Sequence, residues 1–293
     1  MSSKQIFLQI YKDLELGKIE LPTLPDLAIK IRQTLKDETT PIREVTKIIS
    51  IDPTLTAYLI KIANSPIYIG VEKCSDVQSA VIRLGYQSTR NIVMTFTMRS
   101  MFRAKLSKQQ PILSELWLNV SKLAAISSVL ATRCSNFDPD KALTAAMMQD
   151  IGALPIIQKL SRIPDIFNQP TEVNRIIEAY TAKVGALLLH KWNFEDEMIE
   201  AVRSRKDWMR DKSPQADLAD IILIARFHCY VGTAKMRKCP PLRDIPAFKK
   251  LPFGELDAEQ SLLILEHAKE DVNAIKMLLP VPAPVKRKRS GLL

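Results

Sequence analysis

The residues that best suggest chemistry in this chain form the segment Met147–Gly152, in which an apolar helix runs into Asp-Ile-Gly. A carboxylate beside an imidazole at the end of a buried helix is a common way to hold a divalent metal. Here Gln149 stands where the imidazole would be, next to Asp150. Because a neutral amide is a poor ligand for a transition metal, the segment has the pattern of a metal-site helix without its metal chemistry.

Other residues that could do chemistry lack partners at useful spacing. The three histidines, His190, His228 and His267, each stand alone on a predicted helix, which favours structural or surface roles. The carboxylates of 195–197 stand at a predicted helix start, where they favour the helix dipole, and a catalytic carboxylate pair is the alternative. The eight glycines lie too far apart for a phosphate-binding loop, and no Gly-x-Ser-x-Gly motif is present.

Positive charge is concentrated in two places in this chain of net charge +10. The first is a basic run that consists of Arg203, Arg205, Lys206, Arg210 and Lys212. It predicts either a solvated helix end or a site for an anionic ligand or nucleic acid, with strongly salt-dependent phosphate contacts. Trp208 is the only aromatic residue in the run, so base stacking is not indicated. The second is the Lys/Arg cluster 286–289, which follows a Pro-rich stretch and predicts a solvated terminus or an electrostatic contact.

The composition is that of a soluble globular protein, since 46% of the residues are apolar and 25% are charged. No apolar run is long enough to span a membrane, and the N-terminus lacks the apolar core of a signal peptide. We therefore expect no membrane insertion. The four cysteines lie far apart without a Cys-x-x-Cys motif, which favours reduced thiols and a cytoplasmic location.

Helices are the elements that must position these residues, because helical signals recur and alternating strand patterns do not. Capping side chains before proline predict helix starts at Thr40–Pro41, Asp52–Pro53 and Asp138–Pro139. Asp76 predicts another start, in a helix that Gly85 ends. Apolar residues keep the helical period in four further stretches, 113–134, 184–192, 221–228 and 262–277. The predicted fold class is all-α, with about a dozen helices.

The predicted helices divide into two units with a C-terminal extension. Residues 1–110 are expected to form an N-terminal helical lobe and residues 111–234 a helical bundle, with a joint at 105–111. Prolines between Lys235 and Gly254 predict a long surface loop, which precedes a last helix within 235–280. Residues 281–293 are expected to form a disordered basic tail.

Four sequence blocks at fixed spacing carry a family resemblance: 21–25 (Leu-Pro-Thr-Leu-Pro), 49–55 (Ile-Ser-Ile-Asp-Pro-Thr-Leu), 61–65 (Lys-Ile-Ala-Asn-Ser) and 80–85 (Ala-Val-Ile-Arg-Leu-Gly). In these blocks the chain resembles the opening of HDOD domains, bacterial output domains related to HD-type metal-dependent phosphohydrolases. The resemblance covers about residues 18–230. Its recognisable motif residues are Asp52, Pro53, Asn64, Ser65 and Gly85. We interpret Asn64 and Ser65 as structural, because they can satisfy the carbonyls of a helix end.

The resemblance also implies where catalytic HD relatives hold their metal. The former ligand positions fall at or near Asn119, the Gln149–Asp150 pair, Thr181, the Arg205–Lys206 pair and Arg226. Only Asp150 keeps a ligand-type side chain, whereas tight metal binding needs three or more protein ligands. The resemblance therefore implies a degenerate HD-like bundle at 111–234, with no bound metal, no cofactor and no catalytic residue.

Asp150 needs a positive partner if it is buried, because an unpaired buried carboxylate is very costly. If Arg226 replaces a ligand that shared a metal with Asp150, its guanidinium should lie where the cation was. We predict that Asp150 pairs with Arg226 or Arg205. The alternative is that Asp150 caps the helix that follows it, and both can hold together.

Three functions follow from these observations. The resemblance implies a non-catalytic bacterial signal-transduction module, which binds a protein partner in trans or senses a small ligand in the former cleft. The second is a residual metal-dependent phosphohydrolase acting on nucleotides or cyclic dinucleotides, which the missing histidines oppose. The third is an anionic-ligand or nucleic-acid binding protein, which uses the basic run at 203–212.

Overall fold

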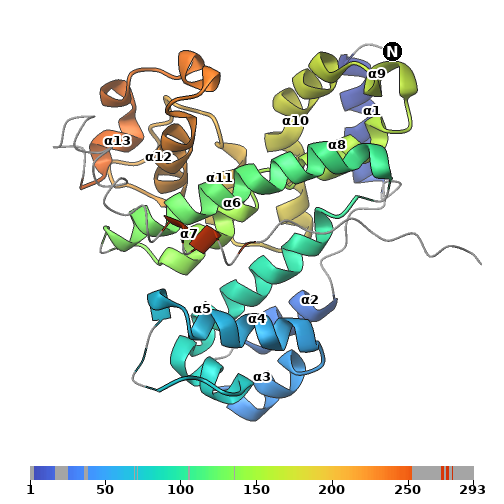
Figure 1. Cartoon of the computed structure of the whole chain (residues 1–293). Coiled ribbons are helices and arrows are strands. Elements are labelled where there is room, and N and C mark those ends of the chain that lie inside the picture. The colour runs from blue at the N-terminus through green and yellow to red at the C-terminus, as the bar shows by residue number, and fades with distance from the viewer. Residues whose placement is uncertain are drawn as a thin grey trace, which may run out of the picture.

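The structure, a computed structural model, describes residues 3–16, 26–35, 39–68, 70, 72–104, 106–134, 136–252, 272–273, 275–276 and 279. All regular elements in these ranges are helices, which confirms the predicted all-α class. They form a smaller N-terminal lobe and a larger bundle, drawn at the bottom and the top of Figure 1. No helix in the described ranges is both long and apolar enough to cross a membrane.

The smaller lobe is a group of short helices around its own apolar core. It contains α2 (Asp26–Thr34), α3 (Ile42–Ile49), α4 (Pro53–Ala63), the turn η1 (Pro66–Tyr68) and the first part of α5 (Val77–Met101). Each helix turns one apolar face inward, and the buried side chains include Ile31, Val45, Leu55, Leu59 and Val81. Burial of such a side chain stabilises the fold by roughly 1.5–3 kcal/mol.

The larger bundle contains the remaining long helices. Its elements are α6 (Gln110–Thr132), α7 (Pro139–Met147), α8 (Ala153–Leu160), α9 (Pro164–Phe167), α10 (Pro170–Lys191), α11 (Asp196–Arg203) and α12 (Leu218–Tyr230). The short turn η2 (Ser107–Gln109) leads into α6. Helix α6 lies against α7 and α12, and α10 lies against α8 and α11. The apolar period predicted for 113–134, 184–192 and 221–228 therefore corresponds to helices α6, α10 and α12.

Helix α5 connects the two lobes and belongs to both cores. Ile92 and Val93 are buried in the core of the smaller lobe, whereas Met94 and Met98 are buried in the core of the bundle. The change from one core to the other thus lies within α5, upstream of the joint predicted at 105–111. Gly85 has φ 74° and interrupts the helical conformation, but helix resumes directly after it, so the predicted helix end at Gly85 is a kink.

Aspartate caps fix the starts of three helices, as predicted. The side chain of Asp52 accepts hydrogen bonds from backbone amides at the start of α4, Asp138 does so at α7, and Asp76 forms a capping box with Ser79 at α5. The cap predicted at Thr40 is wrong. Pro41 holds the N-cap position of α3 without a side-chain bond, and the Thr40 hydroxyl donates to the carbonyl of Thr34.

Two segments lie elsewhere than the sequence predicted. Helix α1 (Ser3–Glu15) packs on α8 and α10 of the bundle, where Ile6 is buried and Asp13 pairs with Lys159 at 2.9 Å. The stretch predicted as a surface loop after Lys235 instead forms η3 (Ala234–Lys238), η4 (Leu242–Asp244) and α13 (Pro246–Lys250). It buries apolar side chains in the bundle core, among them Leu242, Ile245, Phe248 and Leu251.

Several predicted features lie outside the described residues. These are the block at 21–25, His267, most of the last helix predicted within 262–277, and the basic tail 281–293.

Candidate functional site

The segment between α7 and α8 forms the centre of the candidate site. Asp150 lies in the turn after α7, and its carboxylate accepts a hydrogen bond from the Arg205 guanidinium, which follows α11. The two side chains are only 5% and 6% exposed. The pairing confirms the prediction that Asp150 has an arginine partner and selects Arg205 for the direct contact.

Gln149 is fully buried beside this pair, and both ends of its amide are used. Its Nε2 donates to the carbonyl of Ala201 on α11 at 2.9 Å, and its Oε1 accepts from Nη2 of Arg226 on α12 at 3.1 Å. The glutamine therefore joins α11 to α12 across the turn after α7. Nothing in the spacing of residues along the chain could have assigned Arg205 to Asp150 and Arg226 to Gln149.

Positive charge exceeds negative charge in this centre, because two guanidinium groups lie near one buried carboxylate. Burial raises the pKa of Asp150, but Arg205 and Arg226 outweigh it and hold that pKa below its usual range. Burial lowers the pKa of Arg205, Asp150 opposes this, and Arg226 adds to the lowering because it carries like charge. For Arg226, burial lowers the pKa, but Asp150 and Tyr230 outweigh it, so the pKa is raised.

Two further former-ligand positions, Thr181 and Asn119, make no hydrogen bond with the Asp150–Arg205 pair among the described residues. Thr181 is buried on α10, where its hydroxyl donates at 2.6 Å to the carbonyl of Ile177 in its own helix. Asn119 is exposed on α6, so the structure does not bring it into the buried centre. The capping alternative for Asp150 is not realised, since Gly152 holds the N-cap of α8 without a side-chain bond. In the described part of the chain, no three His, Cys, Asp or Glu side chains gather as a metal-binding group.

A close backbone contact, which the sequence analysis missed, holds this turn against α10. A Cβ atom on Gly152 would overlap the carbonyl oxygen of Thr181 and the amide nitrogen of Gly185. A Cβ on Gly185 would lie 2.7 Å from Cγ1 of Val202. The only signal in the sequence was glycine at both positions in a chain where glycine is scarce.

The basic run is not an open patch of positive charge. Arg203 and Lys212 both pair with Glu200, Arg205 pairs with Asp150, and Lys206 pairs with Glu178. The run was predicted as a solvated helix end or an anion site. Carboxylates from α10, from α11 and from the turn after α7 pair with its cations, while the Arg203 and Lys212 side chains stay 61% and 57% exposed, as a solvated helix end predicts.

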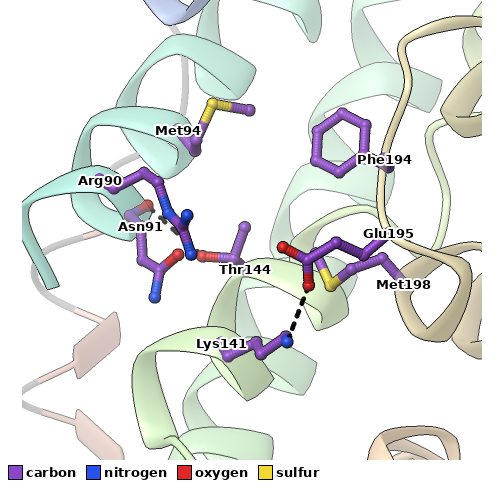
Figure 2. Close-up of a pocket in the computed structure, with 8 residues that line it drawn as sticks. All are labelled: Arg90, Asn91, Met94, Lys141, Thr144, Phe194, Glu195 and Met198. Carbon is purple, nitrogen blue, oxygen red and sulfur yellow. Dashed lines mark hydrogen bonds and ion pairs between the residues drawn. The ribbon is translucent and has the colours of Figure 1, made fainter. Parts of the chain in front are cut away.

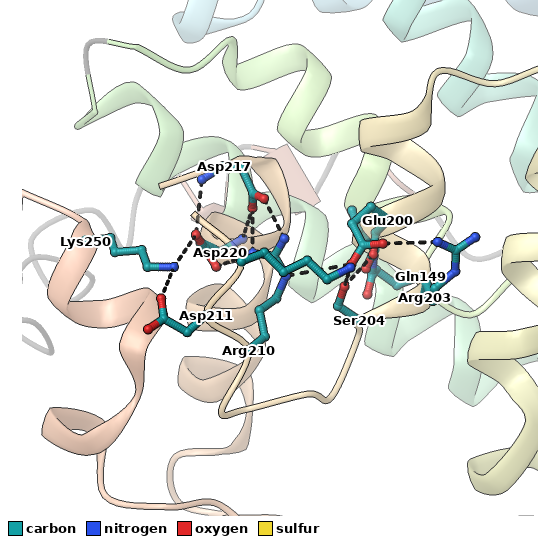
Figure 3. A network of polar contacts seen from close by, with 11 residues as sticks. Gln149, Glu200, Arg203, Ser204, Arg210, Asp211, Asp217, Asp220 and Lys250 are labelled. Atoms are coloured by element: carbon teal, nitrogen blue, oxygen red, sulfur yellow. Dashed lines mark hydrogen bonds and ion pairs between the residues drawn. The ribbon is translucent and has the colours of Figure 1, made fainter. Parts of the chain in front are cut away.

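Arg210 organises the rest of the run as a buried ion-pair network (Figure 3). Its guanidinium donates to Asp217, at 2.8 and 2.5 Å, and to Asp220 at 2.5 Å. Asp217 caps α12, and Lys250 of α13 contacts Asp220 at 3.8 Å. Trp208 packs edge-on against Phe227 and Tyr230 of α12, at 6.3 and 6.1 Å between ring centroids, as expected for a structural residue.

The acidic run at the start of α11 lies in and before its first turn, where Glu195 pairs with Lys141 of α7 (Figure 2). Glu195 holds the N-cap position, and Asp196 and Glu197 lie in the first turn, as the dipole argument predicted. Lys141 pairs with Glu195 at 2.9 Å and also with Glu197, which is not drawn in the figure. The hydrogen bond from Lys141 lowers the pKa of Glu195, which therefore remains ionised and is a poor general acid.

The family-motif residues in the smaller lobe have structural contacts. The Asn64 amide, at the end of α4, donates to the carbonyl of Cys74 and accepts from its backbone nitrogen, both at 2.9 Å. Arg83 donates to the Asn64 side chain at 3.3 Å and to the carbonyl of Ala63 at 3.1 Å. Asn64 thus closes the helix end and anchors the chain before α5. Ser65 is buried beside it.

The histidines with described positions lie on long helices. His190 is in the last turn of α10 and His228 is buried on α12. Burial lowers the pKa of His228 to about 4, so this imidazole is neutral at physiological pH.

Comparison with known families agrees with this architecture. The sequence matches the HDOD domain family over residues 21–208, well over half of the chain. The chain belongs to the HDOD family. A curated relative, an uncharacterised protein of Treponema pallidum, is 23% identical over 198 residues, or 63% of this chain. The match covers 37% of the relative, so this chain spans well under half of that protein's length.

Solved structures share the fold of this HDOD protein at low sequence identity. A Shewanella amazonensis protein, whose name suggests a metal-dependent phosphohydrolase, has a TM-score of 0.80 at 22% identity over 95% of this chain and 99% of its own. An HDOD domain protein of unknown function from Geobacter sulfurreducens has a TM-score of 0.67 at 21% identity, over 94% and 97%. A Marinobacter aquaeolei protein, named for a suggested role in signal transduction, has a TM-score of 0.59 at 17% identity, over 94% and 65%.

Proposed function

We propose that this HDOD protein is a non-catalytic regulatory module of a bacterial signalling pathway, which acts by binding a protein partner. The observation that supports the proposal is the contact of Arg205 with Asp150 beside that of Arg226 with Gln149. In this reading two guanidinium groups supply the positive charge that a metal ion would supply in a catalytic relative. The fold is then retained while the chemistry is lost.

Electrostatics explains why such a centre would resist metal. A cation approaching Asp150 would have to displace the Arg205 guanidinium and would meet the positive charge of Arg226 nearby. Neither Gln149 nor Thr181 offers a strong replacement ligand, because the amide and the hydroxyl already hold their own hydrogen bonds. We place the activity in the cytoplasm, since all four cysteines are free thiols.

We expect the purified protein to hold little metal and to lack phosphohydrolase activity. After purification without chelator and equilibration with Mn²⁺, Fe²⁺ or Zn²⁺, elemental analysis should find far less than one ion per chain. Hydrolysis of bis(p-nitrophenyl) phosphate and of cyclic di-GMP should not exceed the buffer rate, because no described group can activate water at Asp150. Stoichiometric metal together with EDTA-sensitive hydrolysis would support the residual phosphohydrolase instead.

The partner is expected to bind the smaller lobe through exposed aliphatic side chains. Ile51 and Ile82 are 69% and 65% exposed, which exceeds the exposure of Leu118 on the bundle, at 55%. Affinity capture from lysate of the source organism should recover a partner with the wild-type chain, and Ile51→Asp and Ile82→Asp should reduce the yield several-fold. Leu118→Asp is the matched control on the bundle. If Ile51→Asp and Ile82→Asp captured as much partner as Leu118→Asp, the partner would not bind the smaller lobe through these side chains.

A further inference from the structure

A pocket of about 40 Å³ lies between the two lobes, away from the Asp150 centre. Its walls come from α4, η1 and α5 on one side and from α6 and α7 on the other. Ile275 and Leu279, near the C-terminus, also line it. Most of the lining is apolar and includes Ile62, Ile92 and Leu143. The pocket shares no residue with the buried arginine pairs, so it can be assigned a role of its own.

Two polar side chains face this apolar pocket without a hydrogen-bond partner among the described residues. Asn91 and Thr95 stand one turn apart on α5, and they are 6% and 2% exposed. The Asn91 Nδ2 and the Thr95 Oγ1 are both buried and unbonded. Such buried groups destabilise the fold when nothing satisfies them, so their position in a pocket points to an acceptor that fills it.

The neighbouring Thr97 makes the hydrogen bond to its own helix that the Thr95 hydroxyl lacks among the described residues. Thr97 is also buried, and its hydroxyl donates to the carbonyls of Val93 and Met94, at 2.9 and 2.8 Å. This local bond is the usual arrangement for threonine within a helix. The Thr95 Oγ1 makes no such bond within the described part of the chain. Its hydroxyl is thus available to a molecule in the pocket.

The charge of the lining excludes an anionic occupant. Among the described residues, Asp140 is the only formally charged side chain that lines the pocket, and it accepts a hydrogen bond from the Tyr68 hydroxyl across the two lobes. Burial raises the pKa of Asp140, and Asp138 adds to the rise, so this environment already disfavours negative charge. A second anion beside Asp140 would be repelled, whereas a neutral acceptor would not.

We propose that the inter-lobe pocket binds a small neutral molecule whose carbonyl oxygen accepts hydrogen bonds from Asn91 Nδ2 and Thr95 Oγ1. The oxygen has two lone pairs and can serve both donors. The cavity holds roughly three water molecules' worth of space, which suits a ketone or amide group with its adjacent carbons against Ile62 and Leu143. Because both lobes line the pocket, an occupant would favour one arrangement of the lobes and act as an input signal.

The test is a titration of the full chain with N-methylacetamide, followed by NMR of ¹³C-labelled isoleucine and leucine methyl groups. Saturable shifts are expected for Ile62, Ile92 and Leu143. Thr95→Val, which keeps the shape and removes the hydroxyl, should weaken binding about five-fold. Thr97→Val is the matched control and should bind as the wild type does, because the Thr97 hydroxyl is used within its own helix.

A second variant and a second probe test whether the hydrogen bond, rather than the shape of the pocket, determines binding. Thr95→Ser restores the hydroxyl and should bind within about two-fold of the wild type. Isobutene, which has an apolar shape but no oxygen, should cause no saturable shift. Equal affinity of Thr95→Val and wild type would overturn the proposal. Absence of saturation with N-methylacetamide would also overturn it, since the pocket would then hold only water.

Discussion

Replacing Asp150 by asparagine is expected to lower the free energy of unfolding by about 3–5 kcal/mol, because it removes one partner of a buried ion pair. The cost is high because Arg205 and Arg226 then remain buried near each other without the carboxylate that attracts both of their charges. Urea denaturation followed by circular dichroism measures the change. Arg205→Gln should cost less, about 1–3 kcal/mol, because Asp150 keeps the positive charge of Arg226 nearby.

An exposed ion pair provides the matched control. Glu172 pairs with Arg175 on α10 at 2.7 Å, and the arginine side chain is 64% exposed. Glu172→Gln should therefore change the free energy of unfolding by less than about 1 kcal/mol. A loss for Asp150→Asn no larger than that of Glu172→Gln would show that the buried pair contributes little.

The Asp150 contribution should also depend on pH with a definite sign. The folded-state pKa of Asp150 is lowered below that of an ordinary aspartate because Arg205 and Arg226 outweigh the effect of burial. The stabilisation is therefore complete above the unfolded-state pKa and is lost as the pH falls through the folded-state pKa. The difference in stability between wild type and Asp150→Asn should be constant near neutral pH and should shrink only below about pH 4.

Replacing Gly152 by alanine is expected to destabilise the protein by about 3 kcal/mol or more. Gly152 has φ −65° and ψ −18°, a conformation open to any residue, so backbone freedom is not the reason. The reason is space, because the added methyl group would overlap backbone atoms of Thr181 and Gly185 in α10. Neither backbone can move without separating α8 from α10, and thermal and urea denaturation should both report the loss.

At two other glycines, the expected loss of stability depends on whether the added methyl group would contact a buried or a movable side chain. Gly185→Ala meets the Val202 side chain at 2.7 Å and should cost about 1–3 kcal/mol, since a buried side chain can adjust only partly. Gly70→Ala meets the end of the Arg83 side chain at 3.0 Å, which can move, so a change below about 1 kcal/mol is expected. Equal losses at all three positions would contradict the steric explanation.

Local features of this fold follow directly from the sequence. The aspartates that cap α4, α5 and α7 were identified because a cap depends only on the next few residues. Thr40 was misassigned because its hydroxyl found a carbonyl of the preceding helix, a choice that depends on how the chain turns. Helix α1 was assigned to the wrong lobe for a similar reason, since its apolar face fits either core by pattern alone.

The sequence predicts some features of the candidate site, and the tertiary structure decides the others. From the sequence alone, the types of residue at Gln149, Asp150, Arg205 and Arg226 predict that the ligands of a metal enzyme are missing and that Asp150 needs a positive partner. Only the tertiary structure decided that Arg205 makes the contact and that Arg226 bonds Gln149, because these residues meet through the packing of α7, α11 and α12. It also decided that the basic run is paired and that Asn91 and Thr95 face a pocket, since partners distant in sequence leave no local signal.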